Sequence, residues 1–123
     1  MIQTILTILC ALTINFNTHT QDTIRVERGK WTATYYGDRY KTVRKTASGE
    51  TFNMHAMTCA APKKYKFDTR LRVTNLANNK SVIVRVTDRG AFGHSTIDLT
   101  YAAFGKIAKH RDGRVNIKLE VLT

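Results

Sequence analysis

The stretch Ser81–Thr100, SVIVRVTDRGAFGHSTIDLT, decides the fold and points to the chemistry. It opens with a period-two alternation that is typical of a β-strand, because Val82, Val84 and Val86 fall on one face of such a strand. If the alternation continues, the next residue on this valine face is Asp88. The pattern therefore predicts a carboxyl group at the place where a buried strand reaches the surface.

A carboxyl group at the end of an apolar row is partly removed from water. Burial penalises the charged form, so we expect the pKa of Asp88 to rise above the ordinary value of about 3.9. A carboxyl that holds a proton near neutral pH is what general acid catalysis requires. The same residues, Asp-Arg-Gly, also fit a strand that simply ends in an Asx-type turn, and the spacing alone leaves this structural alternative open.

Further alternating runs predict an all-β fold. The hairpin signal Asn78-Asn79 joins the strand before it to the valine strand. Thr100 is a suitable N-cap for a short helix that we expect from Tyr101 to about Lys109. Short strands at this spacing with one helix predict a small closed barrel rather than a βαβ sheet. The other alternating runs are residues 31–36, 70–74 and 115–122.

Length and charge place the chain among small basic domains. The 123 residues are enough for one domain and a leader. Residues 23–123 contain all twenty basic residues against eight acidic ones, a net charge of +12. This charge suits anionic cell-wall polymers and also nucleic acid. Because no helix-turn-helix, zinc-finger or RNA-recognition motif is present, we expect no nucleic-acid partner.

Residues 1–22 are predicted to be a signal peptide or an amino-terminal anchor. The segment from Ile2 to Phe16 is largely apolar and contains no charged residue. As a helix it would rise roughly 22 Å, which is short of the roughly 30 Å hydrocarbon core of a membrane. We therefore expect an exported protein, periplasmic, in the cell envelope or extracellular, with membrane contact only if the leader is retained.

The two cysteines do not predict a disulfide. Cys10 lies in the leader, so Cys59 is left alone in residues 23–123 and is interpreted as a small buried apolar residue. No Cys/His cluster has the spacing of metal ligands. We expect a monomer without metal or cofactor.

Several short motifs in order resemble one known family. The chain is similar to the rare lipoprotein A (RlpA) family of septal-ring lytic transglycosylases over roughly residues 29–122. Each motif is weak alone, and their order and spacing make the resemblance specific. They are Tyr35-Tyr36-Gly37, Thr46-Ala47-Ser48-Gly49-Glu50, Leu71 through Leu76, Ser81 through Val86, Asp88-Arg89-Gly90 and Ile97-Asp98-Leu99.

The resemblance implies a fold and an activity. The fold is a six-stranded double-psi β-barrel covering residues 23–123. The activity is cleavage of peptidoglycan glycan strands without water, which leaves a 1,6-anhydro sugar. Asp88 matches the family's catalytic aspartate, whereas Pro62 stands where the family has a second catalytic residue, a histidine.

The predicted catalytic residues are Asp88 and Glu50. One carboxyl can first protonate the glycosidic oxygen and then accept the proton of the sugar's own 6-hydroxyl, so Asp88 can serve as both acid and base. Glu50 is the candidate for stabilising the positive charge that develops, with a solvated loop acid as the alternative. His55 and His94 can replace the missing histidine only if the fold brings one of them near Asp88.

The predicted substrate-binding residues surround these acids in the sequence. Tyr35 and Tyr36 are neighbours on one strand, so one faces inward and one outward, and a tyrosine on the cleft side can stack on a sugar. Phe92 is expected to shape the cleft wall. The remaining two candidates, Ser48 and Arg89, belong to the family motifs.

Two other functions remain open at this stage. The barrel is shared with expansins, and Pro62 favours a non-catalytic or expansin-like module that binds cell-wall glycan. A virion or secreted-effector component that breaches a cell wall is a further alternative. Fold alone does not decide among them.

Overall fold

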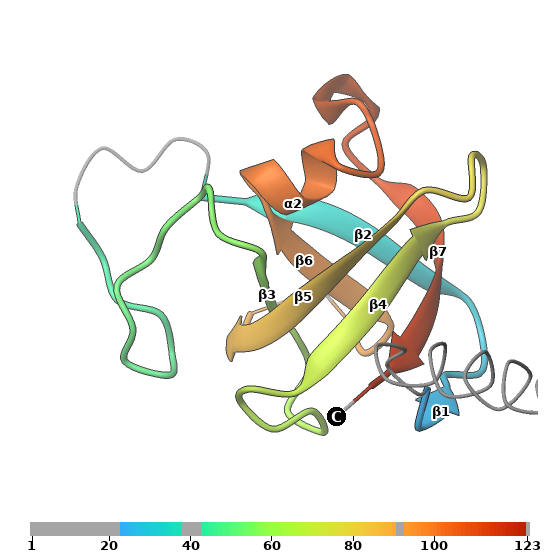
Figure 1. Ribbon diagram of the computed structural model, residues 1–123. Coiled ribbons are helices and arrows are strands. Elements are labelled where there is room, and N and C mark those ends of the chain that lie inside the picture. The colour runs from blue at the N-terminus through green and yellow to red at the C-terminus, as the bar shows by residue number, and fades with distance from the viewer. Residues whose placement is uncertain (1–22, 38–42, 91–92, 123) are drawn as a thin grey trace, which may run out of the picture.

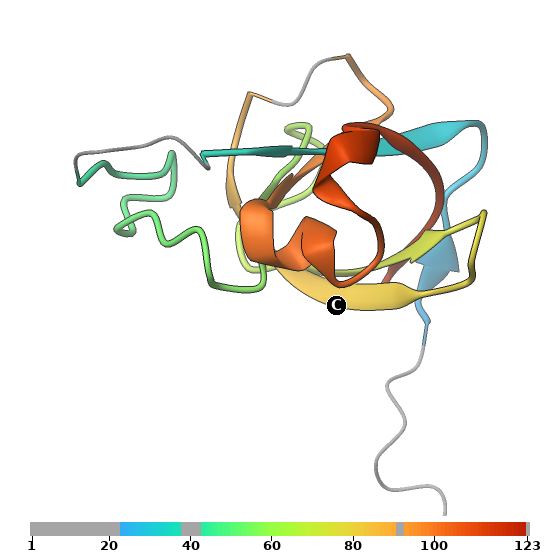
Figure 2. The same ribbon diagram turned by 90° about the horizontal axis from the view of Figure 1, so that it is seen from above.

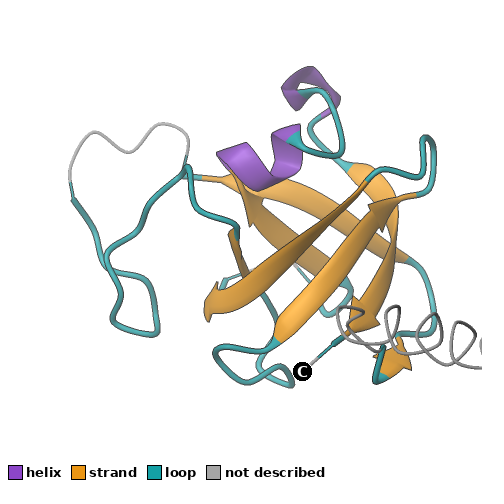
Figure 3. Ribbon diagram, in the orientation of Figure 1, coloured by secondary structure: helices purple, strands orange, loops and turns teal. Residues whose placement is uncertain are grey.

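The computed structural model describes residues 23–37, 43–90 and 93–122, so the predicted leader and Phe92 lie outside the described residues. The described chain is built from strands with two short helical segments, as Figure 3 shows. The strands are β1 (Arg25–Val26), β2 (Trp31–Tyr36), β3 (Thr58–Ala60), β4 (Arg70–Asn75), β5 (Ser81–Asp88), β6 (Thr96–Thr100) and β7 (Val115–Val121). The helices are α2 (Tyr101–Gly105) and the 3-10 turn η1 (His110–Asp112).

Six strands close into a barrel in the order β7-β2-β6-β3-β5-β4, and β4 pairs back to β7 (Figure 1). The short strand β1 pairs with β7 outside this ring. Two pairs are parallel, β2 with β6 and β3 with β5, and the other pairs are antiparallel. This confirms the small all-β double-psi barrel with one short helix.

The core follows from the alternation in the sequence. In β5 the three valines at positions 82, 84 and 86 are buried, and in β4 the same holds for Leu71 and Val73. Closing the sheet removes both free edges and buries these side chains inside one ring. Cys59 is free and fully buried in the same cluster, which confirms its interpretation as an apolar core residue.

The helical segments cover one open end of the barrel (Figure 2). Thr100 caps α2, since its Oγ1 accepts a hydrogen bond from the Ala103 N–H at 3.2 Å. The helix ends at Gly105, earlier than the predicted Lys109. The chain folds back there, and His110 lies so close that a Cβ at position 105 would be 2.9 Å from its ring. Neither helical segment is long and apolar enough to cross a membrane.

The end of β5 departs from the predicted alternation. The parallel pairing of β3 with β5 shifts register where Cys59 lies opposite Val86 and Ala60 lies opposite Asp88. Thr87 takes the next buried position, and Asp88 is only partly buried. The prediction that the valine face runs on to Asp88 is therefore wrong, because a β-bulge inserts one residue and changes which side chains face the core.

Candidate active site

Three donors converge on the carboxyl group of Asp88. The Tyr36 hydroxyl donates to Oδ2 at 2.8 Å. The backbone N–H groups of Ala47 and Arg89 both donate to Oδ1 at 2.9 Å. Donors that point at a carboxyl stabilise its negative charge and fix its orientation. The site therefore holds Asp88 from two separate segments and from its own turn.

The two neighbouring tyrosines separate as predicted, and only Tyr36 reaches Asp88. Burial raises the pKa of Tyr36, and its hydrogen bond to Asp88 acts in the same direction, so this phenol stays a neutral donor. Tyr35 instead donates its hydroxyl to the His110 carbonyl at 3.1 Å and packs against Phe104. The structure does not bring Tyr35 together with the predicted catalytic residues.

The loop Thr46–Glu50 lies against the end of β5 and carries the Ala47 donor. The Ser48 N–H donates to the Thr87 carbonyl at 3.1 Å, which joins the loop to the strand. Within the loop the Ser48 hydroxyl lies 2.9 Å from the Thr46 hydroxyl and donates to Glu50 at 3.3 Å. Ser48, predicted to bind substrate, thus also positions the loop that orients Asp88.

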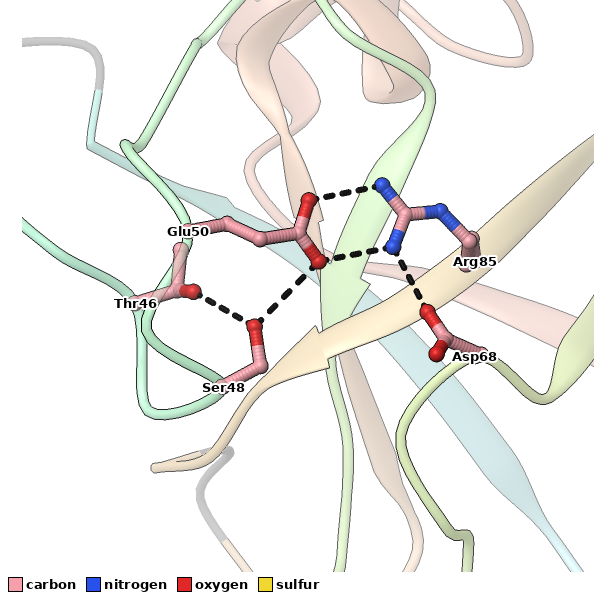
Figure 4. A network of polar contacts seen from close by, with 5 residues as sticks. All are labelled: Thr46, Ser48, Glu50, Asp68 and Arg85. Carbon is pink, nitrogen blue, oxygen red and sulfur yellow. Dashed lines mark hydrogen bonds and ion pairs between the residues drawn. The ribbon is translucent and has the colours of Figure 1, made fainter.

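Glu50 is held by Arg85, as Figure 4 shows. The guanidinium donates to both Glu50 oxygens, at 2.7 and 2.8 Å, and also to Asp68 Oδ1 at 2.7 Å. The hydrogen bond from Arg85 lowers the pKa of Glu50 below its ordinary value, so Glu50 is an anion already paired with a cation. Its carboxylate lies at the edge of the site, as predicted, with its charge largely neutralised.

Arg89 fixes the opposite side of the site. Its guanidinium donates to the Tyr65 carbonyl at 2.8 Å and to the Ala61 carbonyl at 3.3 Å. The same group lies over the Phe67 ring, 4.2 Å from the centroid, in a cation–π contact. Arg89 therefore ties the segment after β3 to the end of β5.

Two hollows adjoin the end of β5. The larger has a volume of about 530 Å³, and Arg89 lines it. The smaller has a volume of about 230 Å³, and Thr87 lines it together with Glu50. The residues directly before and after Asp88 in the sequence therefore line different hollows, whereas Asp88 lines neither of the two.

His94 and Pro62 both line the larger hollow. His94 is exposed there, and no hydrogen bond joins it to Asp88 among the described residues. His55 is exposed and lines neither of the two hollows. Within the described residues no group of three or more His, Cys, Asp or Glu side chains is placed to hold a metal ion.

Asp98 is a second acid of the site that sequence analysis did not assign. The register places Asp88 opposite Ala60 and Ala60 opposite Asp98, so one alanine separates the two acids. Asp98 is buried, and the Thr34 hydroxyl donates to its Oδ1 at 2.8 Å. Burial raises the pKa of Asp98 and repulsion from Asp88 adds to this, while Thr34 and Arg114 act in the opposite direction.

The Arg85 contacts predict that Arg85→Gln lowers catalytic activity by roughly 3- to 10-fold, because the Ala47 donor loses its support. Stability should change little, since solvent screens this partly exposed ion pair. Activity assays and thermal melting curves check both expectations.

Arg72→Gln is the matched control. Arg72 lies on β4, next to β5, and pairs at 3.2 Å with Glu120, a buried residue of β7. This variant should lose more stability and keep its activity. If both variants lose activity equally, the Arg85 effect is general destabilisation and not positioning.

Known proteins resemble this chain in sequence and in fold. The family model described as lytic transglycolase matches residues 29–119. The endolytic peptidoglycan transglycosylase RlpA of Pseudomonas aeruginosa is 43% identical over 97 residues, which cover 78% of this chain and 28% of that protein. The chain thus spans less than a third of the length of this relative.

Two solved structures show the same barrel. The Streptomyces papain inhibitor superposes with a TM-score of 0.66 at 20% identity, covering 85% of this chain and all of that one. An expansin from Clavibacter michiganensis in complex with cellohexaose gives 0.62 at 19% identity, covering 76% of this chain and half of that one. These likenesses concern the fold. Since the family model covers most of the barrel and the sequence motifs agree, the chain belongs to the lytic transglycolase family, to which RlpA belongs.

Proposed function

We propose that the protein is an exported lytic transglycosylase that cleaves peptidoglycan glycan strands. The observation that carries this proposal is Asp88, held by three donors at a strand end whose neighbouring residues line two hollows, with Asp98 beyond one alanine. An enzyme that cuts within a polymer needs space on both sides of the scissile bond. The family relationship supports the same reaction.

The reaction needs one proton donor and one proton acceptor. The bond between C1 and the glycosidic oxygen breaks as that oxygen receives a proton. The 6-hydroxyl oxygen of the same sugar then bonds to C1 and loses its proton to a carboxylate. No water enters the product, so no side chain has to activate one.

The surroundings of the two acids favour different roles for them. Asp88 accepts three hydrogen bonds, which suits a carboxylate that takes the 6-hydroxyl proton. Burial raises the pKa of Asp98, which suits the acid that supplies the first proton. We assign Asp88 as the base and Asp98 as the acid. If Asp98 is dispensable, Asp88 performs both steps in sequence, as the sequence predicted.

The remaining residues position these acids or form the walls. Glu50 and Ser48 hold the loop that orients Asp88. The negative charge of Glu50 stabilises the developing positive charge only weakly, because Arg85 neutralises most of it. Arg89 forms the wall of the larger hollow. Tyr36 orients Asp88, so its hydroxyl acts through that residue.

A non-catalytic wall-binding module is the second candidate. The presence of Pro62 in the larger hollow favours it, because a proline side chain cannot transfer a proton. Such a module would use the same groove to bind glycan and would leave the strand uncut.

Mass spectrometry of products from purified glycan strands in H₂¹⁸O tests the proposal. We expect 1,6-anhydro ends without ¹⁸O. Reducing ends that carry ¹⁸O would show a hydrolase. Intact strands that nevertheless bind the protein would establish the wall-binding module instead.

The place of action follows from the substrate. Peptidoglycan lies outside the cytoplasm, and residues 1–22 have the composition of an export signal. We propose that the protein acts in the envelope as a monomer, and the mass of the exported protein in cell fractions tests whether the leader is removed.

A further inference from the structure

A third hollow lies at the opposite end of β5 from Asp88. It has a volume of about 360 Å³ and is formed between the β4–β5 turn and the segment that follows α2, which both lie in the upper part of Figure 1. Lys80 stands at the start of β5, whereas Asp88 ends it. Eight strand residues at roughly 3.3 Å each separate the two places by about 25 Å. The lining residues are Asn78, Lys80, Gly105, Ala108, Lys109, Arg111 and Asp112.

The walls of this hollow are joined by buried amide contacts. The side-chain amides of Asn75 and Asn78 both donate to the Ile107 carbonyl, at 2.8 and 3.0 Å. The Lys80 N–H donates to Asn78 Oδ1 at 2.9 Å, which fixes the turn itself. The β4–β5 turn is therefore fastened to the segment after α2, and the hollow between them is preformed.

The η1 side of the hollow is equally well fixed. His110 stacks on Tyr101 with ring centroids 3.6 Å apart, and its Nε2 lies 2.7 Å from the Tyr101 carbonyl. His110 also packs over Gly105, where any side chain would collide with it. Lys109 and Arg111, the neighbours of His110, are thereby held at the rim.

The basic side chains of this hollow lack acidic partners. Within residues 23–37, 43–90 and 93–122, no ion pair is formed by Lys80, Lys109 or Arg111. Other basic residues are neutralised, as Arg72 is by Glu120 and Arg85 is by Glu50. Three cations against the single acid Asp112 leave an uncompensated positive charge around a concave surface, which concentrates anions.

We propose that this basic hollow binds an anionic oxygen group, a phosphate or a carboxylate, carried by a cell-envelope polymer. A guanidinium offers paired donors to such a group, and two ammonium groups add charge and single hydrogen bonds. The hollow lies too far from Asp88 for one anion to touch both places. Binding at both ends of β5 would join two weak contacts into a stronger attachment, without any new contact at the active site.

The test is a titration of the full chain, labelled with ¹⁵N, with inorganic phosphate and separately with N-acetylmuramic acid as a carboxylate probe. At low salt we expect saturable shifts of the backbone amides of residues 78–80 and 105–112, with a dissociation constant on the order of millimolar for one probe. Shifts with phosphate alone identify a phosphate-bearing polymer, and shifts with the sugar acid alone identify a carboxylate-bearing one.

A charge-matched pair of variants decides whether the hollow is responsible. Lys80→Gln/Lys109→Gln/Arg111→Gln should weaken probe binding by at least about 10-fold. The control Arg28→Gln/Lys30→Gln/Lys66→Gln removes the same charge from other exposed positions and should retain binding. All six side chains are exposed, so melting temperatures should stay close to wild type.

Two results would overturn the proposal. One is the absence of saturable shifts with either probe, and the other is an equal loss of binding in both triple variants. Neither depends on catalysis, because Asp88 and Asp98 are unchanged in every variant. Two further results would support the proposal independently. Wild type should lose wall binding in molar salt, and the first triple variant should already lack wall binding at low salt.

Discussion

Replacement of Asp88 by asparagine is expected to lower the rate of anhydro-product release by roughly two to four orders of magnitude. Asparagine cannot exchange a proton at neutral pH, whether Asp88 acts as the base alone or as both acid and base. The rate of appearance of 1,6-anhydro ends, measured by mass spectrometry, checks this expectation.

The same substitution should change stability by less than about 1 kcal/mol. The amide oxygen can take the place of Oδ1 and still accept from the N–H groups of Ala47 and Arg89. The amide nitrogen then faces the Tyr36 hydroxyl, which can rotate to accept instead of donating. No cavity opens, because the two side chains have the same shape.

The variant Tyr36→Phe distinguishes the orientation of Asp88 from proton transfer by Asp88. It removes one donor to Asp88 but no proton carrier, so activity should fall by much less than in Asp88→Asn. Full activity of Asp88→Asn would exclude Asp88 from proton transfer. A loss of stability as large as the loss of activity would instead support the turn interpretation of Asp-Arg-Gly.

The sequence predicted those strands that have one buried and one exposed face. In β2, β4, β5 and β7 the alternation is visible because burial changes from residue to residue. β6 carries no such signal, since all five of its residues are buried. β3 is only three residues long, too short for any period to show. Alternation therefore did not reveal β3, which lies between the two acids, or β6, which carries Asp98.

The sequence predicted that a strand ends at Asp88 but not most of the contacts made there. Asp88 was identified correctly as the end of a buried strand, but a bulge opposite β3 cannot be read from a strand's own residues. The pair Glu50–Arg85 joins residues 35 positions apart, and such a contact depends on how the barrel closes. Which of Tyr35 and Tyr36 faces the site was likewise open until the β2–β6 register was known.

The sequence contains an indication that Asp98 is important, although the alternation of apolar and polar residues does not reveal it. It is a single acid between Ile97 and Leu99, in a stretch with no other charged residue from Ser95 to Phe104. A charged side chain in a short apolar run is costly to bury, so it indicates either a satisfied polar contact or a functional group. Thr34 supplies a satisfied polar contact, and the position near Asp88 supports a functional role for Asp98.

Replacement of Asp98 by asparagine should lower activity by roughly two to four orders of magnitude if Asp98 donates the first proton. The same variant should be more stable than wild type at neutral pH. Because burial raises the pKa of Asp98 above its ordinary value of 3.8, ionising this group costs more in the folded state than in the unfolded state. Asparagine never ionises and avoids that cost.

The difference in stability between wild type and Asp98→Asn depends on pH, and its sign follows from the raised pKa of Asp98. Below pH 3.8 Asp98 is protonated in both states, so wild type and Asp98→Asn should differ least in stability there. As the pH rises through the raised pKa of the folded state, wild type loses stability relative to the variant, and above it the difference stays constant. Melting curves of both proteins between pH 3 and pH 8 measure this difference directly.

The two readouts together decide between one acid and two. Lost activity with a stability gain that grows above pH 3.8 would place a proton-holding acid at Asp98 and a separate base at Asp88. Full activity with the same stability gain would leave both proton transfers to Asp88. A variant that is less stable than wild type at pH 7 would contradict the raised pKa of Asp98, because it would mean that the ionised form of Asp98 is stabilised by the fold.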